Sequence, residues 1–359
     1  MRLLTSLMGT KKLSISGNFN YTPEIWQAIS AAVRNMPDLE EVFLCHHCPG
    51  MAQGPVCEVL NQARSLKYLT ITEIIDTSVL DISGVSKRRH PSLNRLLVED
   101  SRCGIQDLKR LISWPCRLEH LLLVPAGEVE NSHVPWGLEE LGPVLESQKT
   151  TLRTLGIWPL DLQGLRGFDL TEFESLEELD LSYFSTGCEP GTEVNLLAPK
   201  LRKFTWAFVF EAGWKCQMTC FEEAQESWLR GFATGALARP LPLGCIHLSF
   251  VPEGYLPDFS VPRPKISPWD RVEHLRDEFH HLGITLTCSA TREDYERLWT
   301  PVRRPEEQGP RLQRSRPPSP DFHYFDPRED GSDSGAESVV RPDSGATQSN
   351  TILNYFARI

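Results

Sequence analysis

The sequence predicts an α/β fold in which a curved parallel sheet carries helices on its convex side. Two observations support this prediction: a recurring six-residue pattern and its spacing. The pattern Leu-x-x-Leu-x-Leu recurs, with some substitutions, from Leu39, Leu66, Leu93, Leu118, Leu152, Leu176, Leu201 and Leu243. Most successive copies begin about 24–34 residues apart, with a longer last gap, and a sequence that repeats at this length indicates a solenoid.

Each hexad reads as a short strand. In "LEELDL", from Leu176, the last four residues alternate, so that positions four and six point inward and positions three and five outward. Helix-period segments lie between several hexads, at residues 24–36, 56–63 and 105–112. Neither piece buries its apolar face alone, whereas stacking aligns the leucines into one core, each contributing about 1.5–3 kcal/mol. We therefore expect a leucine-rich-repeat solenoid.

The repeats are expected to occupy residues 1–300. "TKKLSIS", around Leu13, resembles the strand of a repeat whose beginning is missing, which favours a fragment of a longer protein over an end capped by residues 2–8. Residues 209–300 are expected to form an irregular C-terminal repeat and cap, with a long helix at 216–239, a helix in "WDRVEHLRDEFHH" and a strand at 284–288. Residues 301–359 are rich in Pro, Arg, Ser and Asp, which predicts a disordered tail with a short apolar end.

Composition narrows the class of protein. The chain has 359 residues and a formal charge of −11, which disfavours a nucleic-acid binder that neutralises phosphates. No apolar run approaches the roughly 18 residues that a membrane helix needs, and the N-terminus does not resemble a signal peptide. The ten cysteines are scattered as reduced thiols would be. These features predict an intracellular protein of the cytoplasm or nucleus, without membrane or nucleic-acid partners.

The leucine pattern, together with "MPDLEEVFLC", "HPSLNRLLVED" and "WDRVEHLRDEFHHLGITLTCS", resembles the repeat region of fungal F-box-type leucine-rich-repeat proteins over about residues 10–300. In that family an N-terminal F-box docks on a Skp-type adaptor of a cullin ubiquitin ligase, while the repeats select the substrate. No F-box-like segment precedes the first repeat here, so the resemblance implies substrate recognition and leaves adaptor binding in doubt. It implies a non-enzymatic protein that works as a ubiquitin ligase substrate receptor.

The outward positions of the strands form the expected binding surface on the concave side. The third hexad position gives one column of side chains: Glu41, Tyr68, Arg95, His120, Thr154, Glu178 and Lys203. Across this and the neighbouring columns, an apolar and aromatic band is expected to be exposed and to bind a protein partner: Phe43, Tyr68, Leu97, Leu122 and Trp158. The alternative is that a loop or the tail folds back over the band.

Motifs that would indicate catalysis are weak. "CHHC", from Cys45 to Cys48, contains zinc-ligand types, but four adjacent residues cannot converge on one ion and no second ligand pair follows at the usual spacing. No Gly-rich phosphate loop, Gly-x-Ser-x-Gly elbow or His-Glu-x-x-His helix occurs. We therefore expect no enzyme activity, no cofactor and no metal site.

Two motifs in the tail suggest other interactions. "DSGAES" contains Ser334 and Ser338 in a spacing that resembles a phosphodegron. "SNTILNYF" resembles the short clamp-binding peptides of replication proteins, with Ile352 as the aliphatic plug and Tyr355 and Phe356 as paired aromatics, but without the leading Gln in register. The alternative function is therefore a tail-mediated adaptor in nuclear DNA maintenance, which binds a sliding clamp through residues 349–356 and uses the repeats as a scaffold.

Overall fold

The structure is a computed structural model. It describes residues 9–16, 23–45, 53–72, 89–101, 104–125, 136–158, 165, 167–208, 221–250, 266–293 and 296. The chain divides into two units, Met1–Val302 and Arg303–Ile359, and every described residue belongs to the first. The predicted tail, with Ser334, Ser338, Ile352, Tyr355 and Phe356, lies outside the described residues.

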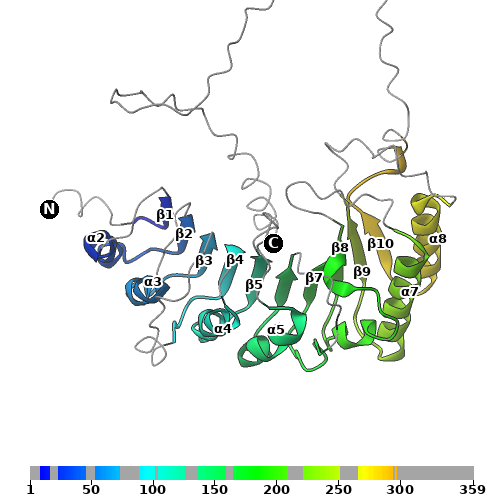
Figure 1. The fold of residues 1–359 in the computed structure, drawn as a ribbon, viewed down its shortest axis with the longest axis horizontal. Helices are drawn as coiled ribbons and strands as arrows, with labels where there is room; N and C mark the ends of the chain where they lie inside the picture. Colours follow the sequence, from blue (N-terminus) through cyan, green and yellow to red (C-terminus); the bar gives the residue numbers. More distant parts are fainter. Residues whose placement is uncertain are drawn as a thin grey trace, which may run out of the picture. The chain divides into compact units, whose positions relative to one another are not determined.

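The described part contains one sheet of ten parallel strands, in which each strand pairs with its neighbours in chain order (Figure 1). The strands are β1 (Lys12–Ser16), β2 (Glu41–Cys45), β3 (Tyr68–Thr72), β4 (Arg95–Ser101), β5 (His120–Pro125), β6 (Thr154–Ile157), β7 (Glu178–Ser182), β8 (Lys203–Ala207), β9 (Cys245–Ser249) and β10 (Thr285–Cys288). Every hexad of the sequence supplies one of them. The sheet confirms the predicted α/β fold with parallel strands.

The helices connect the strands and lie on one side of the sheet (Figure 1). They are α2 (Pro23–Arg34), α3 (Gln53–Leu60), α4 (Ile105–Ser113), α5 (Leu138–Leu145), α6 (Tyr183–Thr186), α7 (Glu223–Ala238) and α8 (Pro268–His281), with 3₁₀ turns η2 (Glu146–Gln148) and η3 (Glu193–Leu196). The three helices predicted between early hexads correspond to α2, α3 and α4. The described part of the β6–β7 connection carries no helix and buries Leu165, Phe168, Leu170 and Phe173 instead.

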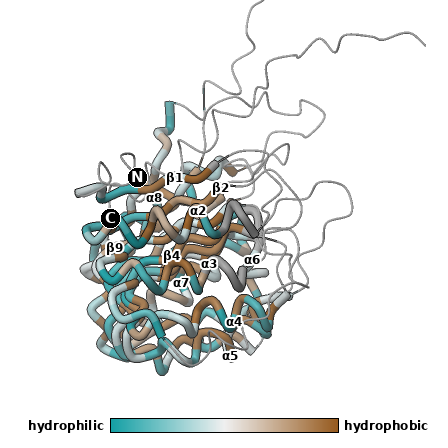
Figure 2. The backbone as a smooth tube through the Cα atoms, turned by 90° about the vertical axis from the view of Figure 1, so that its left-hand side faces the viewer, coloured by the Kyte–Doolittle hydropathy of each residue, from teal (hydrophilic) through white to brown (hydrophobic). Residues whose placement is uncertain are grey.

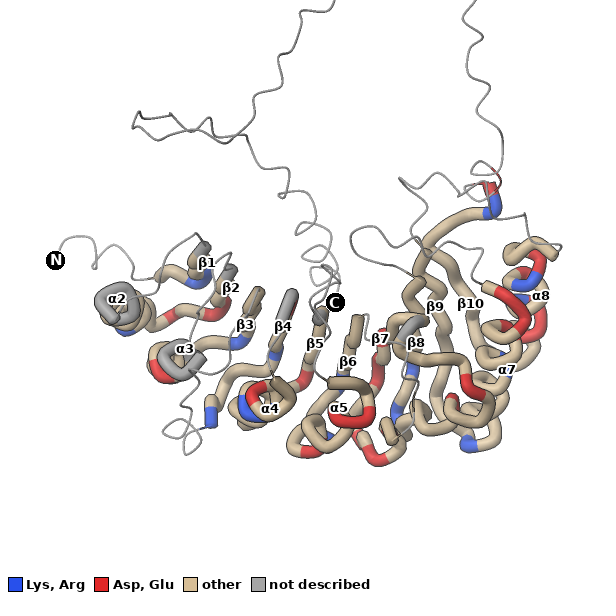
Figure 3. The backbone as a smooth tube through the Cα atoms, in the orientation of Figure 1, with Lys and Arg blue, Asp and Glu red and all other residues tan. Residues whose placement is uncertain are grey.

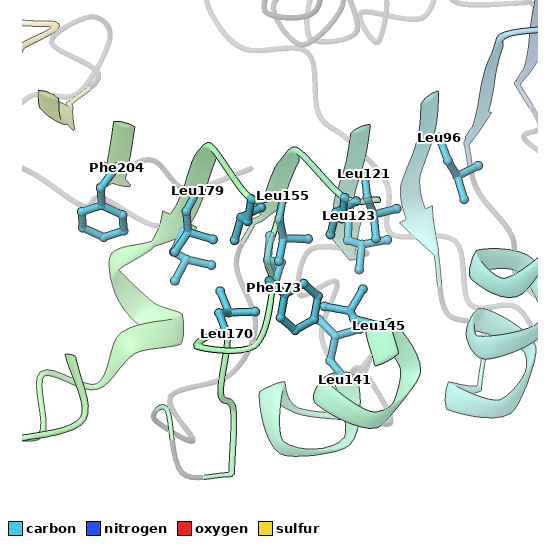
Figure 4. Packing of buried hydrophobic residues seen from close by; sticks show 14 of the residues in the cluster. Leu96, Leu121, Leu123, Leu141, Leu145, Leu155, Leu170, Phe173, Leu179 and Phe204 are labelled. Carbon is cyan, nitrogen blue, oxygen red and sulfur yellow. The ribbon is translucent and has the colours of Figure 1, made fainter. Parts of the chain in front are cut away.

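The core lies between the sheet and these connections. Positions four and six of each hexad point into it, and the strand register aligns Leu121, Leu155 and Leu179 as direct neighbours. Figure 4 shows these side chains directed towards those of α5 and of the β6–β7 connection. In Figure 2 the hydrophobic stretches of the backbone gather in the interior of this layered part. The inward half of the predicted alternation is therefore confirmed.

One backbone pattern joins successive strands at their start. The carbonyl of the residue just before one strand accepts hydrogen bonds from two N–H groups at the start of the next strand. Before β6, for example, the oxygen of Arg153 accepts from Glu177 N at 2.8 Å and from Glu178 N at 3.0 Å. The same pair of hydrogen bonds is accepted by the carbonyl oxygens of Lys11, Glu40, Lys67, Asn94, Glu119, Glu177 and Arg202. Because only backbone atoms take part, these bonds do not depend on which side chain other than proline occupies the positions.

Buried polar side chains add links between repeats. Gln148 is fully buried: its Nε2 donates to the carbonyls of Ile112 (2.9 Å) and Pro115 (3.1 Å), and its Oε1 accepts from Leu118 N (3.1 Å) and Thr151 Oγ1 (2.9 Å). Without Gln148, the carbonyl of Ile112 and the N–H of Leu118 would lose these partners inside the protein, which costs stability. No pattern in the sequence singles out this residue.

The C-terminal part continues the same sheet through β9 and β10, so the array extends further than the loosened spacing suggested. Helix α7 begins later than predicted, because a capping box closes its start: Glu222 N donates to Gln225 Oε1 at 3.0 Å. Helices α7 and α8 are joined by Glu226, which lies 2.9 Å from Arg230 and 2.6 Å from Arg271. This region forms an integral end of the layered structure.

Candidate recognition surface

The face of the sheet opposite the core, called the far face here, carries three columns of side chains. The first column, at the third hexad position, runs across all ten strands in continuous register: Lys12, Glu41, Tyr68, Arg95, His120, Thr154, Glu178, Lys203, Cys245 and Thr285. Lys12 and Thr285 are exposed and the others half-buried. The column predicted from the hexads is thus confirmed, and it extends by one strand at the start and two at the end.

Side chains of the first column pair across neighbouring strands. The contacts are Lys12 Nζ to Glu41 Oε2 (2.7 Å), the guanidinium of Arg95 over the Tyr68 ring (4.8 Å to the centroid), His120 Nδ1 to Thr154 Oγ1 (3.0 Å) and Lys203 Nζ to Glu178 Oε2 (3.7 Å). Charged segments of both signs mark the beginnings of the strands in Figure 3. Partly exposed pairs of this kind contribute little stability, about 0–1 kcal/mol each, but they restrict the orientation of the side chains on this face.

His120 is neutral in this setting. Burial, together with a smaller effect of the nearby Arg95 cation, lowers the pKa of its imidazole to about 4, against the opposing effect of Glu119. Because the ring carries one proton, it both donates and accepts hydrogen bonds, with Nδ1 already facing Thr154.

The second column, at the fifth hexad position, differs from the prediction. Leu97 and Leu122 are only 4% and 3% exposed, although neither belongs to the core cluster. The expectation that these two leucines form an exposed band is therefore wrong. Phe43 and Thr70, at the same position of β2 and β3, remain half-buried.

Gly156 explains part of this difference. It is the neighbour of Leu122 in the second column and has no side chain, and a Cβ built there would lie 2.4 Å from Leu122 Cδ1. Leu122 therefore extends over the glycine and loses contact with solvent. The sequence contains this signal, a glycine in register with a leucine, and it shows that an outward direction alone does not imply exposure.

The third column lies one residue beyond each hexad, towards the ends of the strands. It is also largely buried. Its members with side chains almost inaccessible to solvent are Thr72, Glu99, Val124, Ser182 and Ala207. Trp158, which continues β6 and donates its backbone N–H to the carbonyl of Leu123 at 2.8 Å, is half-buried. Among the five predicted binding residues, Phe43, Tyr68 and Trp158 thus retain exposed surface.

The described residues offer little support for a metal site or a reactive cysteine. Most of "CHHC" lies outside the described residues, and in the part of the chain that the structure covers no group of three or more His, Cys, Asp or Glu side chains is placed to hold a metal ion. Burial raises the pKa of the Cys57 thiol to about 12, which makes it a poor nucleophile.

Comparisons with known proteins give no family. The sequence matches no family model and no curated protein. None of the helices in the described ranges has the length and apolar composition that crossing a bilayer requires.

Proposed function

We propose that the chain is a leucine-rich-repeat solenoid that recognises another protein without catalysing a reaction, and that it binds this partner on the far face. The observation that supports this proposal most is the first column, which stays accessible across all ten strands and in which the side chains from Lys12 to Lys203 contact a neighbour on the next strand. Side chains held in place before binding lose little conformational entropy when a partner arrives.

The binding residues of this proposal are those that keep accessible surface. Tyr68 and Arg95 stack at the middle of the N-terminal half, Phe43 lies one strand before them, and Trp158 lies at the end of β6. Aromatic residues and arginine are the types enriched among residues that dominate binding energy. Leu97 and Leu122 act instead as a buried support for the neighbouring column.

The partner class follows from the resemblance to fungal F-box-type repeat proteins. We propose that the far face selects a substrate protein, as the repeats of those ubiquitin ligase receptors do. Docking on a Skp-type adaptor is a separate property, which needs an F-box in addition to the repeats.

The test compares two sets of substitutions in the full chain. Phe43→Ala with Tyr68→Ala changes the far face, whereas Gln106→Ala with Lys109→Ala changes exposed positions of α4 on the helix side. Affinity purification with quantitative mass spectrometry from cells that express each form identifies proteins lost only with the first pair. Calorimetry with the purified candidate partner should then show affinity reduced about tenfold or more.

Urea midpoints of both variants that equal that of the unsubstituted chain show that folding is intact. The proposal is wrong if partner affinity falls equally with both pairs of substitutions, or with neither.

A further inference from the structure

Arg95 differs from the other charged side chains of the first column. Glu41 pairs with Lys12 across β1 and β2, and Glu178 pairs with Lys203 across β7 and β8. Within the described residues, the Arg95 guanidinium has no carboxylate partner and donates no hydrogen bond; it lies over the face of the Tyr68 ring and near the imidazole of His120. An arginine carries five N–H donors, and here they remain available to a ligand.

The surroundings fix this cation rather than neutralise it. The Tyr68 ring holds Arg95 Cζ 4.8 Å from its centroid, and β4 places Arg95 directly beside His120 of β5. Neutral His120 adds a second group: when Nδ1 accepts from the Thr154 hydroxyl, the opposite Nε2–H is a donor. Arg95, His120 and Thr154 thus occupy successive strands, about 4.8 Å apart.

We propose that Arg95 and His120 form an anion-binding subsite that receives a carboxylate or phosphate group carried by the partner protein. This deepens, and rests on, the proposed recognition function, because it names the chemical class that the far face selects. The planar guanidinium suits two parallel hydrogen bonds to either group, and a donor from His120 reaches a third oxygen lone pair. The acids that lie near His120, Glu119 and Glu177, are engaged by Arg117 and Arg153.

Occupation of the subsite has a signature at His120. Arg95 and Arg153 lower its pKa, while Glu119 and Glu177 raise it, in addition to the dominant effect of burial. An anion bound against Arg95 offsets the cation's contribution and stabilises a protonated ring. Binding should therefore raise the pKa of His120.

The experiment uses the full chain with ¹⁵N-labelled histidine, and His120→Asn assigns the ring signals. Inorganic phosphate and acetate are titrated separately as the two anion classes, with sodium chloride at matched ionic strength as the reference. We expect a saturable shift of the His120 signals and a raised pKa with phosphate, acetate or both. Arg95→Gln should weaken the response about tenfold or more, because a charge-assisted bond is lost. Arg202→Gln, an exposed arginine near the C-terminal half of the sheet, is the matched control and should leave it unchanged.

Two results would overturn the subsite: no anion response beyond that of sodium chloride, or an equal response in Arg95→Gln. Because this readout needs no partner, it is independent of the partner-capture experiment. If the His120 signals do not respond to anions while the variant with Phe43→Ala and Tyr68→Ala loses its partner, the subsite is refuted and the recognition function is supported.

Discussion

Gln148 provides a sharp test of how the repeats are held together. Its amide makes two donor and two acceptor hydrogen bonds from a fully buried position, and these reach the end of α4, the segment after it and the lead-in to β5. Substitution by Glu keeps the shape and the acceptor oxygen for Leu118 N. It replaces the donor Nε2 by an oxygen that faces the carbonyls of Ile112 and Pro115.

The magnitude follows from the groups that lose their partner. The buried carbonyl of Ile112 loses its side-chain donor, which costs about 1–3 kcal/mol, whereas the carbonyl of Pro115 still accepts from Arg89 Nη2 at 3.0 Å but now faces a carboxylate oxygen. The ionised carboxylate adds a desolvation cost, so Gln148→Glu should lower the free energy of unfolding by about 3–6 kcal/mol at neutral pH. This is a large share of a typical stability of about 5–15 kcal/mol.

The pH dependence separates this mechanism from a simple packing defect. Once protonated, the introduced carboxyl group again has a proton to donate to a carbonyl, so its pKa in the folded state is raised above the unfolded value near 4.3. Its favourable contribution is then complete below about pH 4.3 and is lost as pH rises through the folded pKa. The stability difference from wild type should therefore shrink as pH falls.

Urea denaturation followed by tryptophan fluorescence, at pH 8 and at pH 5, measures this difference for Gln148→Glu and for the exposed control Gln106→Glu. We expect the control to stay within about 0.5 kcal/mol of wild type. A difference for Gln148→Glu that is as small as that of the control, or that does not change with pH, would refute the assigned hydrogen bonds.

Three further predictions address the far face and the C-terminal helices. Gly156→Ala places a methyl group 2.4 Å from Leu122 Cδ1, so it should cost about 1–3 kcal/mol by urea denaturation, and less when combined with Leu122→Ala. Strict additivity of the two changes would contradict the contact. Because the pKa of His120 is lowered to about 4, its contribution to stability is present above the unfolded pKa near 6.5 and lost as pH falls from there towards 4. His120→Gln should reduce the pH dependence of the urea midpoint in that window, and an identical profile would count against the assignment. Glu226→Gln removes the carboxylate that joins two arginines of α7 and α8 and should cost about 1–3 kcal/mol, whereas exposed Glu223→Gln should be neutral; equal midpoints would show that the network does not stabilise this end.

Much of the fold could be read from the sequence, because the hexads repeat one local pattern. Leu66, Leu93 and Leu118 each mark the start of a strand whose register with the next is fixed by the same pair of backbone hydrogen bonds. Alternation then assigns the two faces of the sheet without further information. The start of α7 was harder to predict from the sequence, because it is set by the capping box at Glu222 rather than by the apolar pattern.

The candidate site could be predicted only in part, because direction and exposure are different properties. The sequence correctly directs Leu122 away from the core, but its burial depends on Gly156, which lies 34 residues later and becomes a neighbour only through the strand pairing. Gln148 shows the same limit. Its partners come from three segments, and no local pattern distinguishes it from an exposed glutamine.

In the proposed function, the first column is the part of the sheet where residue identity bears most directly on binding. The core columns must be apolar to fill the interior, and the register is maintained by backbone atoms, so neither requirement constrains the first column. A one-residue slip would exchange the two faces and expose the core, which keeps the first column in place. Within the described residues, Arg95 contributes no ion pair that would hold the sheet together. A cation that is oriented by Tyr68 but left without an acid is best explained by an anionic ligand, and the response of His120 decides whether that ligand binds here.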